Sequence, residues 1–159
     1  MSADELTIRH GVSELIAEAA ERIDDDRLEG WAELFGDPCR YLIIDRAAHE
    51  AGMRQGIMYA ATKGMLLDRV FTIRNANLFE PHRYRHVIGQ VRLKAVEDGT
   101  AIVHSPFIAA RIMQTGETTL FATGRYLDRI DISGRDYRFT ERIVVLDSDR
   151  IDTLLAIPL

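Results

Sequence analysis

The stretch YRHVIGQVRLKAVEDGTAIVHSPFIAARIM (residues 84–113) decides the fold class of this chain. Its apolar and polar residues alternate, which is typical of β-strands that bury one face. The alternation is interrupted at Asp98-Gly99, a dipeptide that strongly favours a tight hairpin turn. Two more strand-like segments follow at residues 117–132 and 136–147, each preceded by a glycine-containing turn. The second half of the chain therefore predicts long strands that meander antiparallel to one another.

The first half has helical periodicity instead. Apolar residues recur every three or four positions between Ile8 and Ile23, and Ser2 followed by Glu5 matches a capping box. A shorter helix is expected with its apolar face from Leu28 to Phe35, preceded by Asp26 as its cap. Further on, the pattern predicts a strand over 41–44, a loop over 47–56 and a helix over 63–74.

Helices followed by strands indicate an α+β fold of one domain, residues 1–159, with the N-terminal helices packed on a strongly curved antiparallel sheet. By analogy between folds, this layout matches the NTF2-like (cystatin-like) cone.

Composition restricts the function. The chain is 47% hydrophobic, carries a net charge of −5 and has a single cysteine, Cys39. An acidic chain is a poor partner for nucleic acid, and one cysteine forms neither an intrachain disulfide nor a cysteine-based zinc or iron–sulfur site. The N-terminal residues lack the apolar region of a signal peptide, and no apolar run approaches the roughly 20 residues of a membrane helix. We therefore expect a soluble cytoplasmic protein.

The block HRYRH (residues 82–86) contains two histidines and two arginines that are candidate site residues. On a strand, its two histidines would lie about 13 Å apart, too far to share one metal ion. Alternation places His82, Tyr84 and His86 on one face and Arg83, Arg85 and Val87 on the other. Arginines at every second position suit carboxylate partners. Two interpretations remain open: ion pairs within the chain, to Glu80, Glu97 or Asp98, or contacts with a partner subunit.

An enzymatic alternative rests on His104, His49 and Asp45 as interior acid or base residues of a dehydratase, an isomerase or a small-ligand-binding module. His104 lies in an apolar run, where desolvation would lower its pKa. A lone histidine in such a strand is more often a core residue, and no Ser-His-Asp or phosphate-loop signature is present. The ending DTLLAIPL (residues 152–159) is apolar, which indicates a terminus covered by the core or by another chain.

Residues 66–93 resemble the signature region of the small (β) subunits of Rieske-type aromatic-ring-hydroxylating dioxygenases. In that family a helix leads through an acidic and proline turn into a strand marked R-x-R-H. The corresponding positions here are Arg69, Arg74, Glu80, Pro81, Arg83, Arg85 and His86. A G-x-Y-x-D pattern at 124–128 and the closing segment 141–159 extend the resemblance over essentially the whole chain. The HRYRH block, TGET (residues 115–118) and the apolar ending look closest to the branch that acts on aromatic carboxylates such as terephthalate, salicylate or anthranilate.

The resemblance implies that the large and small subunits have different roles. In this family the large (α) subunit carries the Rieske [2Fe–2S] cluster and a mononuclear iron, and the small subunit assembles with it, commonly as α3β3. The chain is then expected to bind no cofactor and no metal, to contain no catalytic residue of its own, and to support a holoenzyme that adds dioxygen to an aromatic ring. Its subunit-interface candidates are Arg83, Arg85, His86, Tyr84 and Arg74. A homotrimer of this chain alone is compatible with that role.

Overall fold

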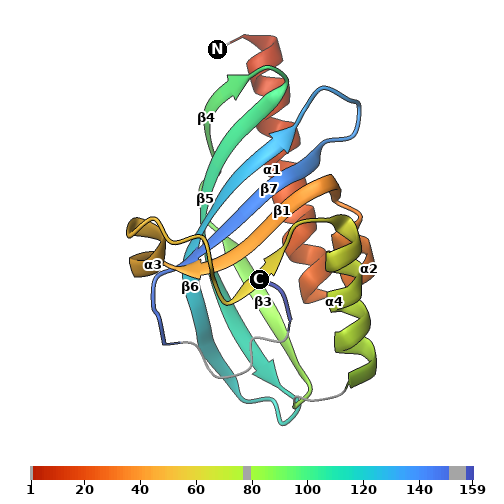
Figure 1. The fold of residues 1–159 in the computed structure, drawn as a ribbon, viewed down its shortest axis with the longest axis vertical. Helices are drawn as coiled ribbons and strands as arrows, with labels where there is room; N and C mark the ends of the chain where they lie inside the picture. Colours follow the sequence, from red (N-terminus) through yellow and green to blue (C-terminus); the bar gives the residue numbers. More distant parts are fainter. Residues whose placement is uncertain (1, 77–79, 151–156) are drawn as a thin grey trace.

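The computed structural model describes residues 2–76, 80–150 and 157–159. It contains four helices and seven strands in these ranges (Figure 1). The helices are α1 (Ala3–Asp24), α2 (Leu28–Ala32), α3 (Arg46–Glu50) and α4 (Lys63–Ala76). The strands are β1 (Phe35–Asp45), β2 (Met58–Ala60), β3 (His82–Ile88), β4 (Arg92–Glu97), β5 (Thr100–Met113), β6 (Thr118–Asp131) and β7 (Arg138–Leu146).

The described strands form one sheet in the order β2-β1-β7-β6-β5-β3, with β4 also paired to β5. Helices packed on a curved sheet confirm the α+β class. One pairing departs from the antiparallel prediction, because β1 and β7 run parallel. Parallel neighbours need a long connection, and here the connection comprises α3, β2, α4 and four strands.

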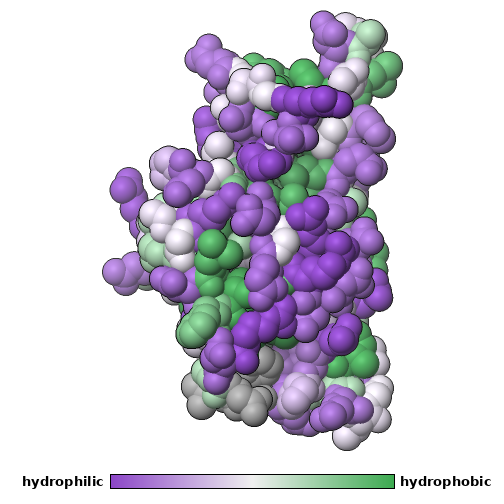
Figure 2. Space-filling view, turned by 90° about the vertical axis from the view of Figure 1, so that its right-hand side faces the viewer, coloured by the Kyte–Doolittle hydropathy of each residue, from purple (hydrophilic) through white to green (hydrophobic). Residues whose placement is uncertain are grey.

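The helices divide between the two faces of the sheet. Residues of α1, α2 and α4 share the main core with the strands, and α1 runs behind the long strands in Figure 1. The short α3 instead packs Ala48 on a second cluster formed by Leu42, Ile44 and Val145. Hydrophilic side chains dominate the side that carries α2 and α4, and hydrophobic ones appear there in separate patches (Figure 2).

Aromatic rings fill the core where α2 meets β1 and β7. Trp31 contacts the edges of Phe35 and Tyr41 at centroid distances of 5.1 and 5.2 Å, and Phe35 packs on Phe139 at 5.1 Å. Such aromatic pairs stabilise a core by about 0.5–1.5 kcal/mol each beyond their burial. The Tyr41 hydroxyl donates to the Leu159 carbonyl at 2.7 Å and accepts from its N–H at 3.0 Å, while Ile157, Pro158 and Leu159 are buried. The described part of the apolar ending is therefore covered by the chain's own core; residues 152–156 lie outside the described ranges.

Three local predictions are corrected. Residues 46–50 form α3 within the predicted loop, because the Asp45 carboxylate accepts the Ala48 N–H at 2.9 Å and caps the helix. The second helix ends at Ala32, so that Phe35 already belongs to β1. Asp26 does not cap that helix, whose N-cap residue is Arg27 and makes no side-chain capping hydrogen bond.

The long strand predicted from residue 84 to 97 is divided into β3 and β4, which both pair with β5. Gly89 lies between them and donates its N–H to the Pro106 carbonyl at 2.8 Å. A Cβ at this position would press against the Pro106 ring, so glycine permits the close approach of the two chains.

Candidate subunit-contact surface

Strand β3 separates the HRYRH block into two rows with different environments. Tyr84 and His86 face the core, with exposed fractions of 2% and 8%, and His82 is half-buried beside them. Arg83, Arg85 and Val87 point outward and are exposed. The row that a partner can reach is therefore Arg83, Arg85 and Val87, whereas Tyr84 and His86 are already occupied by the core.

His86 anchors β3 to the end of α1. Its ring Nδ1 lies 2.6 Å from one carboxylate oxygen of Asp24, and its backbone N–H donates to the other oxygen at 2.8 Å. Both side chains are buried, so the pair is shielded from water and each hydrogen bond is strengthened. Arg85 approaches the same carboxylate only at 3.8 Å and keeps 66% of its side chain exposed. None of the predicted ion pairs to Glu80, Glu97 or Asp98 is formed by Arg83 or Arg85.

Arg74 joins α4 to the turn between α1 and α2. Its guanidinium lies 2.8 Å from both carboxylate oxygens of Asp26 and 3.0 Å from Glu29. The hydrogen bond from Arg74 is the main reason why the pKa of Glu29 is lowered. Arg74 therefore already has acidic partners inside the chain, unlike Arg83.

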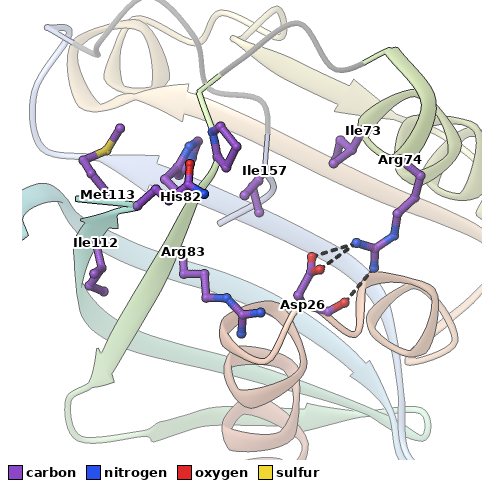
Figure 3. Close-up of a pocket in the computed structure, with 10 residues that line it drawn as sticks. Asp26, Ile73, Arg74, His82, Arg83, Ile112, Met113 and Ile157 are labelled. Carbon is purple, nitrogen blue, oxygen red and sulfur yellow. Dashed lines mark hydrogen bonds and ion pairs between the residues drawn. The ribbon is translucent and has the colours of Figure 1, made fainter. Parts of the chain in front are cut away.

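An open groove of about 430 Å³ separates Arg74 from β3 (Figure 3). Ile73, Ile112, Met113 and Ile157 line it with apolar side chains, and Arg83 lines it as well. Arg83 forms no ion pair with an acidic residue of the described ranges. The groove thus combines apolar side chains with an available guanidinium, a combination that suits an acidic segment of another chain.

The alternative acid–base candidates do not meet inside the cone. On β5 the residues Val103 and Ser105 face inward, so alternation turns His104 outward. Burial, then the nearby Arg125 and Lys94, lower the pKa of His104, as its apolar surroundings predicted. His49 lies in α3 beside the groove formed with Arg40 and Tyr59, and Asp45 is the cap of that helix. Their expected interior position is wrong, because each belongs to the outer side of the sheet or to its edge.

Sequence reasoning missed the most buried ion pair of the described chain. Arg142 on β7 donates to Asp128 on β6 at 2.8 and 2.9 Å, and both side chains are almost fully buried. The guanidinium lies over the rings of Tyr126 and Phe139, 3.8 and 4.3 Å from their centroids. Burial raises the pKa of Asp128, and Arg142 opposes that rise.

The signal for this pair was present in the G-x-Y-x-D pattern. Alternation turns Gly124, Tyr126 and Asp128 to the same inner face. A Cβ on Gly124 would collide with the Val145 carbonyl, so this position needs glycine for the approach of β6 to β7. The pattern therefore records packing and charge pairing inside the sheet.

The residues of this chain do not fit an iron–sulfur cluster. In the described ranges, no three histidine, cysteine or acidic side chains are grouped to hold a metal ion. A Rieske cluster requires two cysteines and two histidines, and Cys39 is the only cysteine and is buried. None of the helices in those ranges is both long and apolar enough to cross a membrane.

Three helices, α1, α2 and α4, cover one face of a curved sheet, and β3 presents exposed arginines on the other face; this is the architecture of the NTF2-like fold. The chain belongs to the family of ring-hydroxylating dioxygenase beta subunits. The model of this family, described as ring hydroxylating beta subunit, matches residues 18–153. Over 140 residues it is 41% identical to subunit beta 2 of the terminal oxygenase component of terephthalate 1,2-dioxygenase from Comamonas sp., covering 88% of this chain and 91% of the relative. It is 33% identical to the anthranilate 1,2-dioxygenase small subunit of Burkholderia cepacia, covering 86% and 85% of the two chains.

Solved structures agree with this assignment. The beta subunit of a protein described as an aromatic-ring-hydroxylating dioxygenase from Novosphingobium aromaticivorans superposes with a TM-score of 0.90 at 35% identity, covering 98% of this chain and 99% of that one. A protein described as a scytalone dehydratase from the same organism gives 0.74 at 14% identity, with 99% and 95% covered. The second likeness concerns the fold alone and confirms the NTF2-like prediction.

Proposed function

We propose that this chain is the structural, non-catalytic small subunit of a cytoplasmic dioxygenase that acts on an aromatic carboxylate. The observation that carries the proposal is the 41% identity to a terephthalate 1,2-dioxygenase beta subunit over 88% of the chain. The aromatic substrate class follows from that relative and from the anthranilate enzyme. The large subunit would bind the substrate and supply the chemistry of a Rieske cluster and a mononuclear iron, since the described residues of this chain contain no group of three metal-ligating side chains.

The arrangement of charged groups supports a structural role. The two buried acid–base pairs, Asp24 with His86 and Asp128 with Arg142, hold elements of the fold together. Neither of the histidines considered as catalysts, His49 and His104, lies inside the cone. The exposed Arg83 and Arg85 are instead available to a partner, and we propose that they contact the large subunit in an α3β3 assembly.

Co-expression of the chain with a large (α) subunit of such a dioxygenase tests the proposal. The two chains should co-elute in size-exclusion chromatography, and light scattering should give the mass of three copies of each. The complex should hydroxylate an aromatic carboxylate, while the lone chain should contain no stoichiometric iron and show no activity. Failure to co-elute, together with a dehydratase or isomerase activity of the lone chain that His104→Ala abolishes, would refute it.

A further inference from the structure

A set of buried polar atoms on the inner face of the sheet has no hydrogen-bond partner within the described ranges. It consists of the hydroxyls of Tyr84, Ser105 and Tyr126 and the ring Nε2 of His86, and we call these residues the inner polar group. None of them has an exposed fraction above 8%. Buried polar atoms in folded proteins almost always bond to protein groups, to ordered water or to a ligand. The inner polar group therefore points to a molecule that the fold encloses.

The strand register brings the inner polar group together. Ser105 on β5 lies directly opposite Tyr126 on β6. Tyr84 and His86 are alternate residues of β3, and their ring centroids are 6.0 Å apart. Phe107 lies between these two pairs, since its ring stacks on Tyr126 at 4.5 Å and is 6.0 Å from the His86 ring. The polar atoms thus belong to one region of the interior, around the ring of Phe107.

Asp24 determines which nitrogen of His86 is available to this region. An ionised carboxylate only accepts hydrogen bonds, so the Nδ1 that lies 2.6 Å from Asp24 carries the ring proton. In the neutral imidazole, Nε2 is then an acceptor. The hydroxyls of Tyr84 and Tyr126 can donate as well as accept. A molecule among them therefore needs an O–H that donates to Nε2 and an oxygen that accepts from a tyrosine.

The open groove of about 430 Å³ lies at one end of the same row of rings (Figure 3). His82 lines this groove, and its ring centroid is 5.3 Å from that of Tyr84, the neighbour of His86 in the row. The groove is therefore the side from which a small molecule would reach the inner polar group. Its apolar lining suits a molecule that is mostly apolar.

We propose that the inner polar group binds the hydroxyl of a small molecule, either ordered water or a simple phenol. The hydroxyl donates to Nε2 of His86 and accepts from Tyr84 or Tyr126. Phe107 and Phe121, which stack on these two tyrosines, supply aromatic surface for the ring of a phenol. Water and phenol share this hydroxyl chemistry, and binding requires no catalytic residue and no contact with the large subunit.

Removal of single hydroxyls tests whether they are bonded. Tyr126→Phe and Tyr84→Phe keep the rings, and each should lower the folding equilibrium constant about fivefold in urea unfolding, because a hydrogen bond to the enclosed molecule is lost. The exposed Tyr59→Phe is the matched control and should leave it unchanged. If the hydroxyls bind nothing, their removal relieves an unsatisfied buried group. An unchanged or increased stability of both variants would then overturn the proposal, and Ser105→Ala repeats the test should either fail to fold.

NMR of the full chain tests the acceptor role of His86. Imidazole ¹⁵N spectra should show a proton on Nδ1 and none on Nε2, whereas protons on both nitrogens would overturn the proposal. Added phenol should shift the His86 ring signals saturably, and Tyr126→Phe should weaken the phenol affinity about fivefold, unlike Tyr59→Phe.

A high-resolution crystal structure of the chain separates the two sources of the hydroxyl. If phenol does not bind but a water lies within hydrogen-bond distance of Nε2 of His86, the occupant is water. If neither molecule is found there, the proposal is overturned. None of these measurements involves the large subunit, so the proposed function is tested separately by co-elution.

Discussion

Removal of the Asp128 carboxylate should be the most damaging single change in the sheet. Asp128→Asn keeps the shape of the side chain but leaves the Arg142 guanidinium, 1% exposed, without its anionic partner. Two charge-assisted hydrogen bonds of 2.8 and 2.9 Å are weakened or lost. No described acidic side chain other than Asp128 bonds to Arg142, so the charge has no replacement partner.

The size of the loss of stability in Asp128→Asn follows from the burial of the ion pair. Breaking a buried pair by removing one partner destabilises a protein by about 3–5 kcal/mol, because a desolvated charge is left uncompensated. Because the rings of Tyr126 and Phe139 still stabilise part of the charge, the expected loss of stability is about 3 kcal/mol. With a urea dependence of about 2 kcal/mol per molar, the unfolding midpoint should fall by about 1.5 M.

Urea unfolding of the lone chain, followed by circular dichroism at one fixed protein concentration, measures this loss. Asp25→Asn is the control, since Asp25 forms an exposed 3.4 Å pair with Arg27, and such pairs contribute less than about 1 kcal/mol. The double variant Asp128→Leu with Arg142→Met should recover most of the stability, because an apolar pair of similar volume often equals a buried ion pair. A loss below about 1 kcal/mol for Asp128→Asn, or a double variant no better than the single one, would refute the reasoning.

Four further substitutions probe three other sites. Asp24→Asn should lower the free energy of unfolding by about 1–3 kcal/mol, because the buried His86 ring loses its anionic partner. Thermal and urea unfolding measure this loss, with Asp25→Asn as the control. Equal losses in the two variants would contradict the prediction. Tyr41→Phe should cost about 1–3 kcal/mol through the two lost bonds to Leu159, whereas the exposed Tyr59→Phe should be neutral in the same assay. The lowered pKa of His104 means that the folded chain binds fewer protons than the unfolded one, so stability should fall as the pH drops through the normal imidazole range of about 6.5. His104→Asn should make that fall less steep, and Arg125→Gln should raise the pKa of His104 in an NMR titration; an unchanged pKa would show that Arg125 does not act on it.

Periodicity predicted the elements whose side chains alternate between core and solvent. The helix that begins after Ser2 is capped as the sequence indicated, with the Glu5 N–H donating to the Ser2 hydroxyl at 3.1 Å. The inward and outward rows of β3 also follow from alternation alone. Such patterns are readable because they depend only on whether each residue meets water.

Contacts between distant segments were not predictable in the same way. The pairing of β1 with β7 and the ion pairs from Asp24 to His86 and from Asp128 to Arg142 join residues that no local pattern connects. The sequence predicts Asp26 as a helix cap, yet Asp26 binds Arg74, and its neighbour Asp24 binds His86. A carboxylate has the same local appearance whether it caps a helix or pairs with a cation, so only the tertiary structure separates the two roles.

The R-x-R-H mark places one buried residue and two exposed arginines on the same strand. His86 turns inward and bonds to Asp24, so it holds α1 against the sheet. Arg83 and Arg85 turn outward, where their charges contribute little to the stability of the isolated chain. A change at His86 should therefore weaken the fold and, through it, every activity of the complex, whereas a change at Arg85 should leave the melting temperature intact and act on assembly. That contrast makes one short sequence mark informative about both the fold and the partner.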